Sequence, residues 1–284
     1  MWLTIHLILS LIPGATAVTV DTFVPAGAVM DGGGGLQVGG VDIGGRGDGY
    51  VGAWLVYTRR PVVETWPDGD QAPVVSDLFA TWLAGGMTVA GLLRLDAGLP
   101  IYPYVSAPGV PYAGGSVGDL RLSATAPIWR SDVVALAVAP GLSVPTGRAN
   151  ALTSTGRLGG GAVGIVEVTP GGLVAGRGRL GAEARPVGEL GGVALGSVLL
   201  GGLGVGVRPE SGVEVGAELT GALDLVGYTA TASPVELHVY GSVVPRSGLS
   251  LVLGAGTGLL AGVGAPEVRV LLGVGYHDAG PAGE

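Results

Sequence analysis

The stretch that decides the fold is VEVGAELTGALD, residues 213–224. Apolar or small side chains stand at its odd positions, beginning with Val213, whereas its even positions include Glu214, Glu218 and Asp224. A period of two is typical of a β-strand with one apolar and one polar face. The same period runs through most of the chain after Tyr50, so the sequence predicts an all-β protein.

Twelve runs of this kind are separated by turn signals rich in Gly, Pro, Asp and Ser. They lie near residues 50–58, 76–84, 88–100, 118–128, 133–144, 159–169, 172–184, 193–207, 212–224, 234–244, 248–258 and 266–276.

The connections between these runs alternate in length. Those after even-numbered runs are short, as at 85–87, whereas those after odd-numbered runs are longer, as at 59–75, 101–117 and 145–158. Short turns on one rim and long loops on the other are typical of outer-membrane barrels. The pattern predicts a closed antiparallel transmembrane β-barrel over residues 50–276 with about 12 strands, and with 10 or 14 as alternatives.

Composition excludes several other classes of protein. Glycine supplies 57 of the 284 residues, charged residues make up only 13%, and Cys and Lys are absent. Low charge and many apolar residues argue against disorder. The net charge of −8 and the lack of a basic stripe argue against nucleic-acid binding. Without Cys there is no disulfide scaffold, thiolate metal site or thiol catalysis.

A soluble β-sandwich would also show alternating strands. Aromatic residues are only 5% of the chain, which is few for a thick core, and most strand charges share one face. In hydrocarbon every backbone polar group must pair internally, so a sheet that spans a membrane must close. We therefore expect Val, Leu and Ala to face lipid and the charged side chains to face the lumen.

The N-terminal stretch has the features of a secretory signal. Residues 3–12 form an apolar run, and Ala15-Thr16-Ala17 fits a cleavage site. The run is too short for a spanning helix, which needs about 20 residues. We predict a cleaved signal peptide over 1–17, a glycine-rich segment over 18–49 that acts as a plug or adds a strand, and a short periplasmic tail over 277–284.

Face sorting by parity predicts which charges line the lumen and form a selectivity network. Six arginines and ten acidic residues fall on the polar face, together with His238, so a pore of this kind would favour cations. They are Arg94, Arg121, Arg177, Arg179, Arg185, Arg269, Asp77, Asp96, Asp119, Glu167, Glu183, Glu214, Glu218, Asp224, Glu236 and Glu267.

Aromatic residues predict a partial girdle at the membrane interface. Strand direction places Tyr50, Trp82, Trp129 and Tyr276 at the short-turn end and Tyr57 at the long-loop end. The parity of Trp129 points inward, so ordinary packing is an equal alternative for that residue.

Catalytic and metal-binding patterns are not found in the sequence. His238 is the single His in a predicted strand, and no Gly-x-Ser-x-Gly elbow is present. Asp42 and Asp48 in a glycine-rich stretch supply too few ligands for Ca²⁺. We expect no enzyme activity, no catalytic residue, no metal and no cofactor.

Three stretches resemble a known family. They are YVGAWLVYTRRP at 50–61, GDLRL at 118–122 and PGLSVPTG at 140–147. Together they resemble the N-terminal barrel of OmpA-family proteins from myxobacteria and related bacteria. The last two are also similar to the MetA-pathway phenol-degradation family of outer-membrane transporters. No C-terminal peptidoglycan-binding domain is expected, since the chain stops soon after the last strand.

These observations predict a non-enzymatic outer-membrane barrel, either a narrow pore or a transporter for small solutes. The alternatives are a closed structural barrel that supports membrane integrity and, more remotely, a membrane-embedded hydrolase. The expected partners are outer-membrane lipid and the barrel-assembly machinery. Both chain ends are expected in the periplasm. The solute and the oligomeric state stay open.

Overall fold

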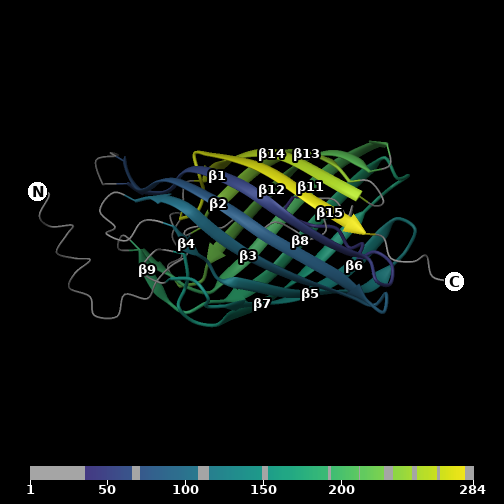
Figure 1. Cartoon of the computed structure of the whole chain (residues 1–284), viewed down its shortest axis with the longest axis horizontal. Coiled ribbons are helices and arrows are strands. Elements are labelled where there is room, and N and C mark those ends of the chain that lie inside the picture. The colour runs from purple at the N-terminus through teal and green to yellow at the C-terminus, as the bar shows by residue number, and fades with distance from the viewer. Residues whose placement is uncertain are drawn as a thin grey trace, which may run out of the picture.

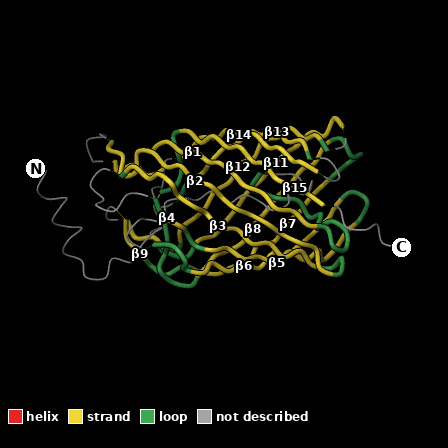
Figure 2. The backbone as a smooth tube through the Cα atoms, in the orientation of Figure 1, coloured by secondary structure: helices red, strands yellow, loops and turns green. Residues whose placement is uncertain are grey.

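The computed structural model describes residues 36–65, 71–107, 115–148, 153–190, 193–210, 212–226, 233–244, 248–260 and 263–278. These residues form a closed antiparallel barrel, whose tilted strands run along the length of the molecule (Figure 1). Strands and loops make up this part of the chain, and it contains no helix (Figure 2). No helix among these residues is long and apolar enough to cross a membrane.

Twelve strands form the wall, and three short strands lie in the connections. The wall strands are β1 (Gly49–Thr65), β2 (Gln71–Val89), β3 (Leu93–Ser106), β5 (Leu120–Arg130), β6 (Val134–Val144), β7 (Gly159–Val168), β8 (Val174–Ala184), β11 (Val198–Glu210), β12 (Val213–Asp224), β13 (Val235–Val243), β14 (Gly248–Leu260) and β15 (Val268–Asp278). The short strands are β4 (Ser116–Val117), β9 (Gly188–Leu190) and β10 (Val193–Leu195).

Each wall strand pairs with its sequence neighbour, and the first strand pairs with the last. The β1–β15 register runs from Gly49 opposite Asp278 to Arg59 opposite Val268. This pairing removes both free edges, so every wall strand has a partner on each side. The predicted fold class and strand number are confirmed.

The alternation of short and long connections is also present, although some short turns lie further along the chain than predicted. The sequence pattern placed the first short turn at 85–87, but β2 continues to Val89 and the turn is Ala90-Gly91-Leu92. Ala90 and Gly91 adopt φ values of 55° and 71°, which suit a tight turn. A Cβ at Gly86 would meet Asp96 and Tyr50, so this glycine makes room inside the strand pair rather than a turn.

The outward face of the wall is apolar. Leu180, Leu203 and Val51 are 72%, 67% and 65% exposed, and many other Val and Leu side chains of the same parity are exposed as well. Charged and polar side chains of the opposite parity are buried inside the barrel. An apolar exterior with the charged side chains directed inward is the arrangement that a barrel in lipid requires.

The aromatic prediction is partly wrong. Tyr50 and Trp82 are buried and face inward, so neither belongs to a girdle. Trp129 is exposed, because the register of β5 and β6 shifts between Pro127 and Trp129 and this irregularity reverses the parity. Tyr276 is exposed near the short turns, and Tyr57 is exposed near the long loops.

The interior is divided into two regions. Inward side chains of β3, β2, β1, β15 and β14 form an apolar cluster that includes Trp54, Leu78, Trp82 and Leu271. We call this side of the wall the apolar arc. The facing strands β7, β8, β11 and β12 carry buried charges, and we call them the charged arc. The charged side chains that these strands direct inward include Glu167, Arg177, Arg179, Arg208, Glu214 and Glu218.

Strand β11 lies in the middle of the charged arc, and its inward positions 202, 204 and 206 are all glycines. A Cβ at Gly206 would lie 2.5 Å from Oε1 of Glu214, and one at Gly204 would lie 3.1 Å from Cγ of Glu218. A Cβ at Gly202 would lie 3.2 Å from Nε of Arg179. The glycines of this strand therefore leave room for the large charged side chains of its neighbours.

Candidate functional site

The interior near the short turns contains a dense ion-pair cluster. Nη1 and Nη2 of Arg177 donate to the two carboxylate oxygens of Glu214 at 2.7 and 2.8 Å. Nε of Arg208 donates to Glu214 at 2.7 Å, and its Nη2 donates to Glu167 at 3.4 Å. The Tyr240 hydroxyl donates to Glu214. Two-point Arg–carboxylate pairs are strong and fix geometry. We call these five residues the short-turn cluster.

Two members of the short-turn cluster were not among the predicted site residues. Arg208 was assigned to a turn at 208–211, but β11 continues to Glu210 and places it in the wall. Tyr240 shares the parity of Glu236 and His238, so strand alternation could have found it. Parity does place Tyr240 on the polar face, but the predicted site residues were limited to charged side chains and His238.

Residues 36–48, which we call the inner segment, precede β1. Residues 36–41 are buried in the interior, and the rest of the segment runs to the short-turn rim, where Asp42 and residues 44–46 are exposed. The backbone N–H groups of Leu36, Gln37 and Val38 donate to the Glu218 carboxylate at 2.7, 2.7 and 3.3 Å. Nη1 of Arg179 donates to the carbonyl of Gln37 at 2.6 Å. The charged arc therefore binds the main chain of this segment, largely independently of its side chains.

Further contacts bind the inner segment closer to the short-turn rim. The N–H of Val41 donates to Glu167 at 3.0 Å, and Nη1 of Arg94 donates to the Asp42 carbonyl at 3.3 Å. Arg94 also pairs with Asp96 at 3.2 Å. Leu36 is fully buried and packs within the apolar cluster. The inner segment thus lies between the two arcs.

A second ion-pair group lies near the long loops. Nε of Arg269 donates to Glu236 at 3.2 Å, and Nη1 donates to Oγ1 of Thr58 at 3.3 Å. Nε2 of His238 lies 3.3 Å from Glu236. All four side chains are buried. We call them the long-loop cluster.

The other predicted lumen residues have different surroundings. Asp119 accepts N–H groups of Gly147 and Thr155, and Asp224 accepts those of Gly196 and Val226, so both carboxylates brace long connections. Glu183 pairs with Arg185 at 2.8 Å. Arg121 is half-buried on β5.

Two carboxylates assigned to the polar face lie toward the outside. The Glu267 side chain is 49% exposed and lies 3.5 and 3.6 Å from Arg59 and Arg60 at the long-loop rim. Asp77 accepts the hydroxyl of the exposed Tyr57. Both lie where the alternation is interrupted: Glu267 just precedes β15, and Asp77 lies opposite Arg59, where the β1–β2 register begins to shift.

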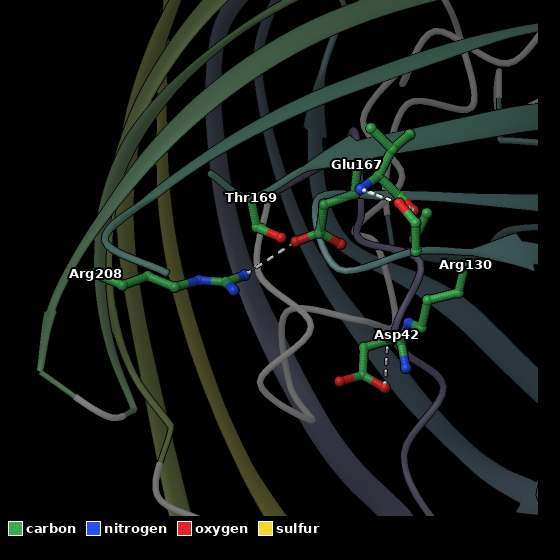
Figure 3. Close-up of a pocket in the computed structure, with 8 residues that line it drawn as sticks. Asp42, Arg130, Glu167, Thr169 and Arg208 are labelled. Atoms are coloured by element: carbon green, nitrogen blue, oxygen red, sulfur yellow. Dashed lines mark hydrogen bonds and ion pairs between the residues drawn. The ribbon is translucent and has the colours of Figure 1, made fainter. Parts of the chain in front are cut away.

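A polar cavity of about 200 Å³ opens at the short-turn rim between the inner segment and the wall. Figure 3 shows the carboxylates of Glu167 and Asp42 and the guanidinium of Arg208 directed toward it. Arg130 pairs with Asp42 at 3.6 Å, and both side chains are largely exposed. Ser131, Val134, Ala135 and Thr169 complete the lining.

The interior offers no cation cage in the part of the chain that the structure describes. No group of three or more His, Asp or Glu side chains there has an arrangement that could hold a metal ion. The buried carboxylates instead accept hydrogen bonds from arginines and backbone amides. The chemistry of this interior is therefore charge pairing and main-chain binding.

The fold is a closed antiparallel β-barrel of the porin-like kind. No protein-family model matches the chain, and no curated protein matches its sequence. Similarity appears at the level of structure, where the neighbours are outer-membrane channels and porins.

Three solved structures illustrate this similarity. The COG4313 outer membrane channel from Pseudomonas putida F1 superimposes with a TM-score of 0.63 at 14% identity, over 82% of this chain and 96% of that one. The NanC porin gives a TM-score of 0.52 at 8% identity, over 81% and 98%. The KdgM porin gives 0.50 at 11% identity, over 80% and 98%. At these identities the likeness shows the fold.

Proposed function

We propose that this chain is a non-enzymatic outer-membrane channel for small solutes, whose passage is limited by the inner segment. The supporting observation is the way this segment is held. Its backbone N–H groups donate to Glu218 and Glu167, and its residues add no strand to the wall. An obstruction held by side-chain contacts and apolar packing, and not paired as a strand, can leave while the wall keeps its own hydrogen bonds.

The charges of the interior indicate which ions the proposed channel would prefer. Within the charged arc, Glu167, Glu214 and Glu218 outnumber Arg177 and Arg179, and Arg208 from β11 balances the count. The long-loop cluster is also balanced, with one arginine beside one glutamate, so the acidic surplus comes from the bracing carboxylates Asp119 and Asp224. A lumen with an acidic surplus attracts cations. We therefore propose cation preference for the conducting state.

The proposal extends to the location of the protein and its assembly in the membrane. The likeness to OmpA-family and MetA-pathway barrels at 50–61, 118–122 and 140–147 supports placement in the outer membrane. We propose export through the signal peptide at 1–17, insertion by the barrel-assembly machinery, and a periplasmic short-turn rim. Gly49 and Asp278 pair at that rim, so both ends of the wall would face the periplasm.

The packed interior favours one alternative, a non-conducting structural barrel. Trp54, Leu36 and Arg269 are fully buried, so the described interior is largely filled. Single-channel recording in planar bilayers separates the two functions. We expect small currents from the native chain and larger, cation-selective currents from Glu218→Gln, because the neutral amide cannot hold three N–H groups as a carboxylate does.

The matched control is Glu267→Gln, which removes a carboxylate at the exposed rim and should leave the current unchanged. Silence from the native chain, from Glu218→Gln and from a variant lacking residues 36–48 would support the structural barrel instead. A preference for anions in the open variants would contradict the selectivity.

A further inference from the structure

The charged arc binds a short stretch of main chain from two sides. Strands β8, β11 and β12 are neighbours in the wall (Figure 1). Glu218 on β12 accepts the backbone N–H groups of residues 36–38. Nη1 of Arg179 on β8 donates to the Gln37 carbonyl. We call Glu218 and Arg179, with Gly202 and Gly204 of β11 between them, the main-chain site.

The two glycines of the main-chain site lie beneath the inner segment. Gly204 lies opposite Glu218 in the β11–β12 pairing, and Gly202 lies opposite Arg179 in the β11–β8 pairing. A Cβ at Gly202 would lie 3.1 Å from Cγ2 of Val38, so a side chain there would crowd the segment. The site therefore lets a peptide backbone approach the wall closely, between an acceptor and a donor.

The apolar arc selects an apolar side chain on the same stretch. Leu36 is fully buried and belongs to the apolar cluster with Trp54 and Leu271. A Cβ at Gly254 on β14 would lie 3.5 Å from Cδ2 of Leu36, so the leucine reaches the apolar wall. Main-chain hydrogen bonds that give affinity and side-chain contacts that give specificity are how proteins bind peptides.

The inner segment satisfies the main-chain site only in part. Nε of Arg179 and Nε2 of Gln37 are buried, and neither has a hydrogen-bond partner among the residues that the structure describes. A buried donor without a partner makes binding less favourable. The site therefore binds the backbone of Gln37 without selecting its side chain, and another peptide can compete for it.

We propose that the main-chain site binds short peptides that carry an apolar side chain, and that residues 36–38 occupy it as a tethered competitor. The N–H groups of the peptide donate to Glu218, one of its carbonyls accepts from Arg179, and its apolar side chain takes the place of Leu36. The inference names a solute class for the proposed channel and in that respect rests on the proposed function.

The tether decides how strongly a free peptide must compete. Residues 39–48 join the bound stretch to β1, so its effective concentration at the site is on the order of millimolar. A free peptide therefore binds well only when the tethered stretch is weakened. Leu36→Ser removes the apolar anchor of that stretch, while it keeps all three N–H groups and leaves the wall unchanged.

The test uses the full chain in detergent micelles and a capped, fluorescently labelled peptide with the sequence of residues 36–41, LQVGGV. Fluorescence anisotropy measures its binding to the native chain and to Leu36→Ser. We expect saturable binding to Leu36→Ser that is at least about tenfold tighter than to the native chain, because the competitor has lost its buried leucine. Far-UV circular dichroism checks that the variant is folded, and the milder Leu36→Ala replaces it if it is not.

Two matched controls separate main-chain binding from partition into detergent. A peptide that is N-methylated at its first three residues is at least as apolar but lacks the N–H donors, so it should bind Leu36→Ser at least about tenfold more weakly. Added to Leu36→Ser, Arg179→Gln should weaken binding about fivefold. Arg121→Gln should leave it unchanged, because Arg121 is half-buried on β5, outside the charged arc.

No saturable binding to Leu36→Ser, or equal binding of the methylated peptide, would overturn the main-chain site. So would a loss in Arg121→Gln as large as that in Arg179→Gln. Equal affinity of the native chain and Leu36→Ser would contradict the tethered competitor. Since anisotropy needs no current, a silent barrel that binds the peptide contradicts only the transport role, and a conducting barrel that does not bind it contradicts only this inference.

Discussion

The apolar arc and the charged arc use the same strand geometry for opposite chemistry. Trp54, Leu78 and Leu271 fill the first by close packing, whereas Arg177, Glu214 and Glu218 fill the second by paired charges beside inward glycines. The apolar arc gains stability from burial, which is not directional. The charged arc needs each partner in place, because an unpaired buried charge is costly. The inner segment meets both arcs. The charged arc binds its main chain deep in the interior through Glu218 and Arg179, and strands of the apolar arc bind it near the short-turn rim through Thr88 and Arg94.

Glu214→Ala should break the charged arc most severely. Arg177 has a fully buried side chain and would lose its two-point partner, which costs about 3–5 kcal/mol. Urea unfolding in micelles, followed by tryptophan fluorescence, measures this loss. Glu267→Ala removes a half-exposed carboxylate and should cost less than about 1 kcal/mol. Equal losses for the two variants would mean that the charged arc adds no special constraint.

Leu78→Ala tests the apolar arc by leaving a cavity. Leu78 is fully buried, so the expected cost is about 3 kcal/mol in the same assay. Leu180→Ala shortens a side chain on the outward face, where detergent replaces the lost contacts, and should cost well under about 1 kcal/mol. A small effect at Leu78 would show that the arc relaxes around the gap.

Gly206→Ala sharpens the comparison by adding one methyl group to the charged arc. The new Cβ would lie 2.5 Å from Oε1 of Glu214, so the short-turn cluster must shift, at a cost of about 1–3 kcal/mol. Gly201→Ala in the same strand meets nothing within 4 Å and isolates the effect of replacing a strand glycine. If both changes behave alike, the inward glycines are not needed for space.

The fold could be predicted because parity and turn spacing are local signals. Alternation along residues 213–224 and the rhythm of short and long connections gave the barrel and its twelve wall strands. Face sorting also placed Arg177 and Glu214 on the same face, and they are direct partners.

The remainder depended on long-range contacts that local spacing does not reveal. Trp129 reversed its parity at a register shift near Pro127, and Gly86 makes room for Asp96 and Tyr50 instead of forming a turn. The apolar arc was missed because an apolar side chain at an inward position looks the same in sequence as one that faces lipid. The contacts of the inner segment with Glu218 join residues about 180 positions apart, which no motif marks.

The pairing of β1 with β15 has a consequence for biogenesis. Because Gly49 lies opposite Asp278, one edge of β1 can form its backbone hydrogen bonds only after β15 is in place. Until then the sheet has two edge strands whose unpaired backbone groups hydrocarbon cannot solvate. Insertion and circularisation should therefore be one late event, and a nascent wall that lacks β15 should stay in the aqueous compartment as a target for proteases.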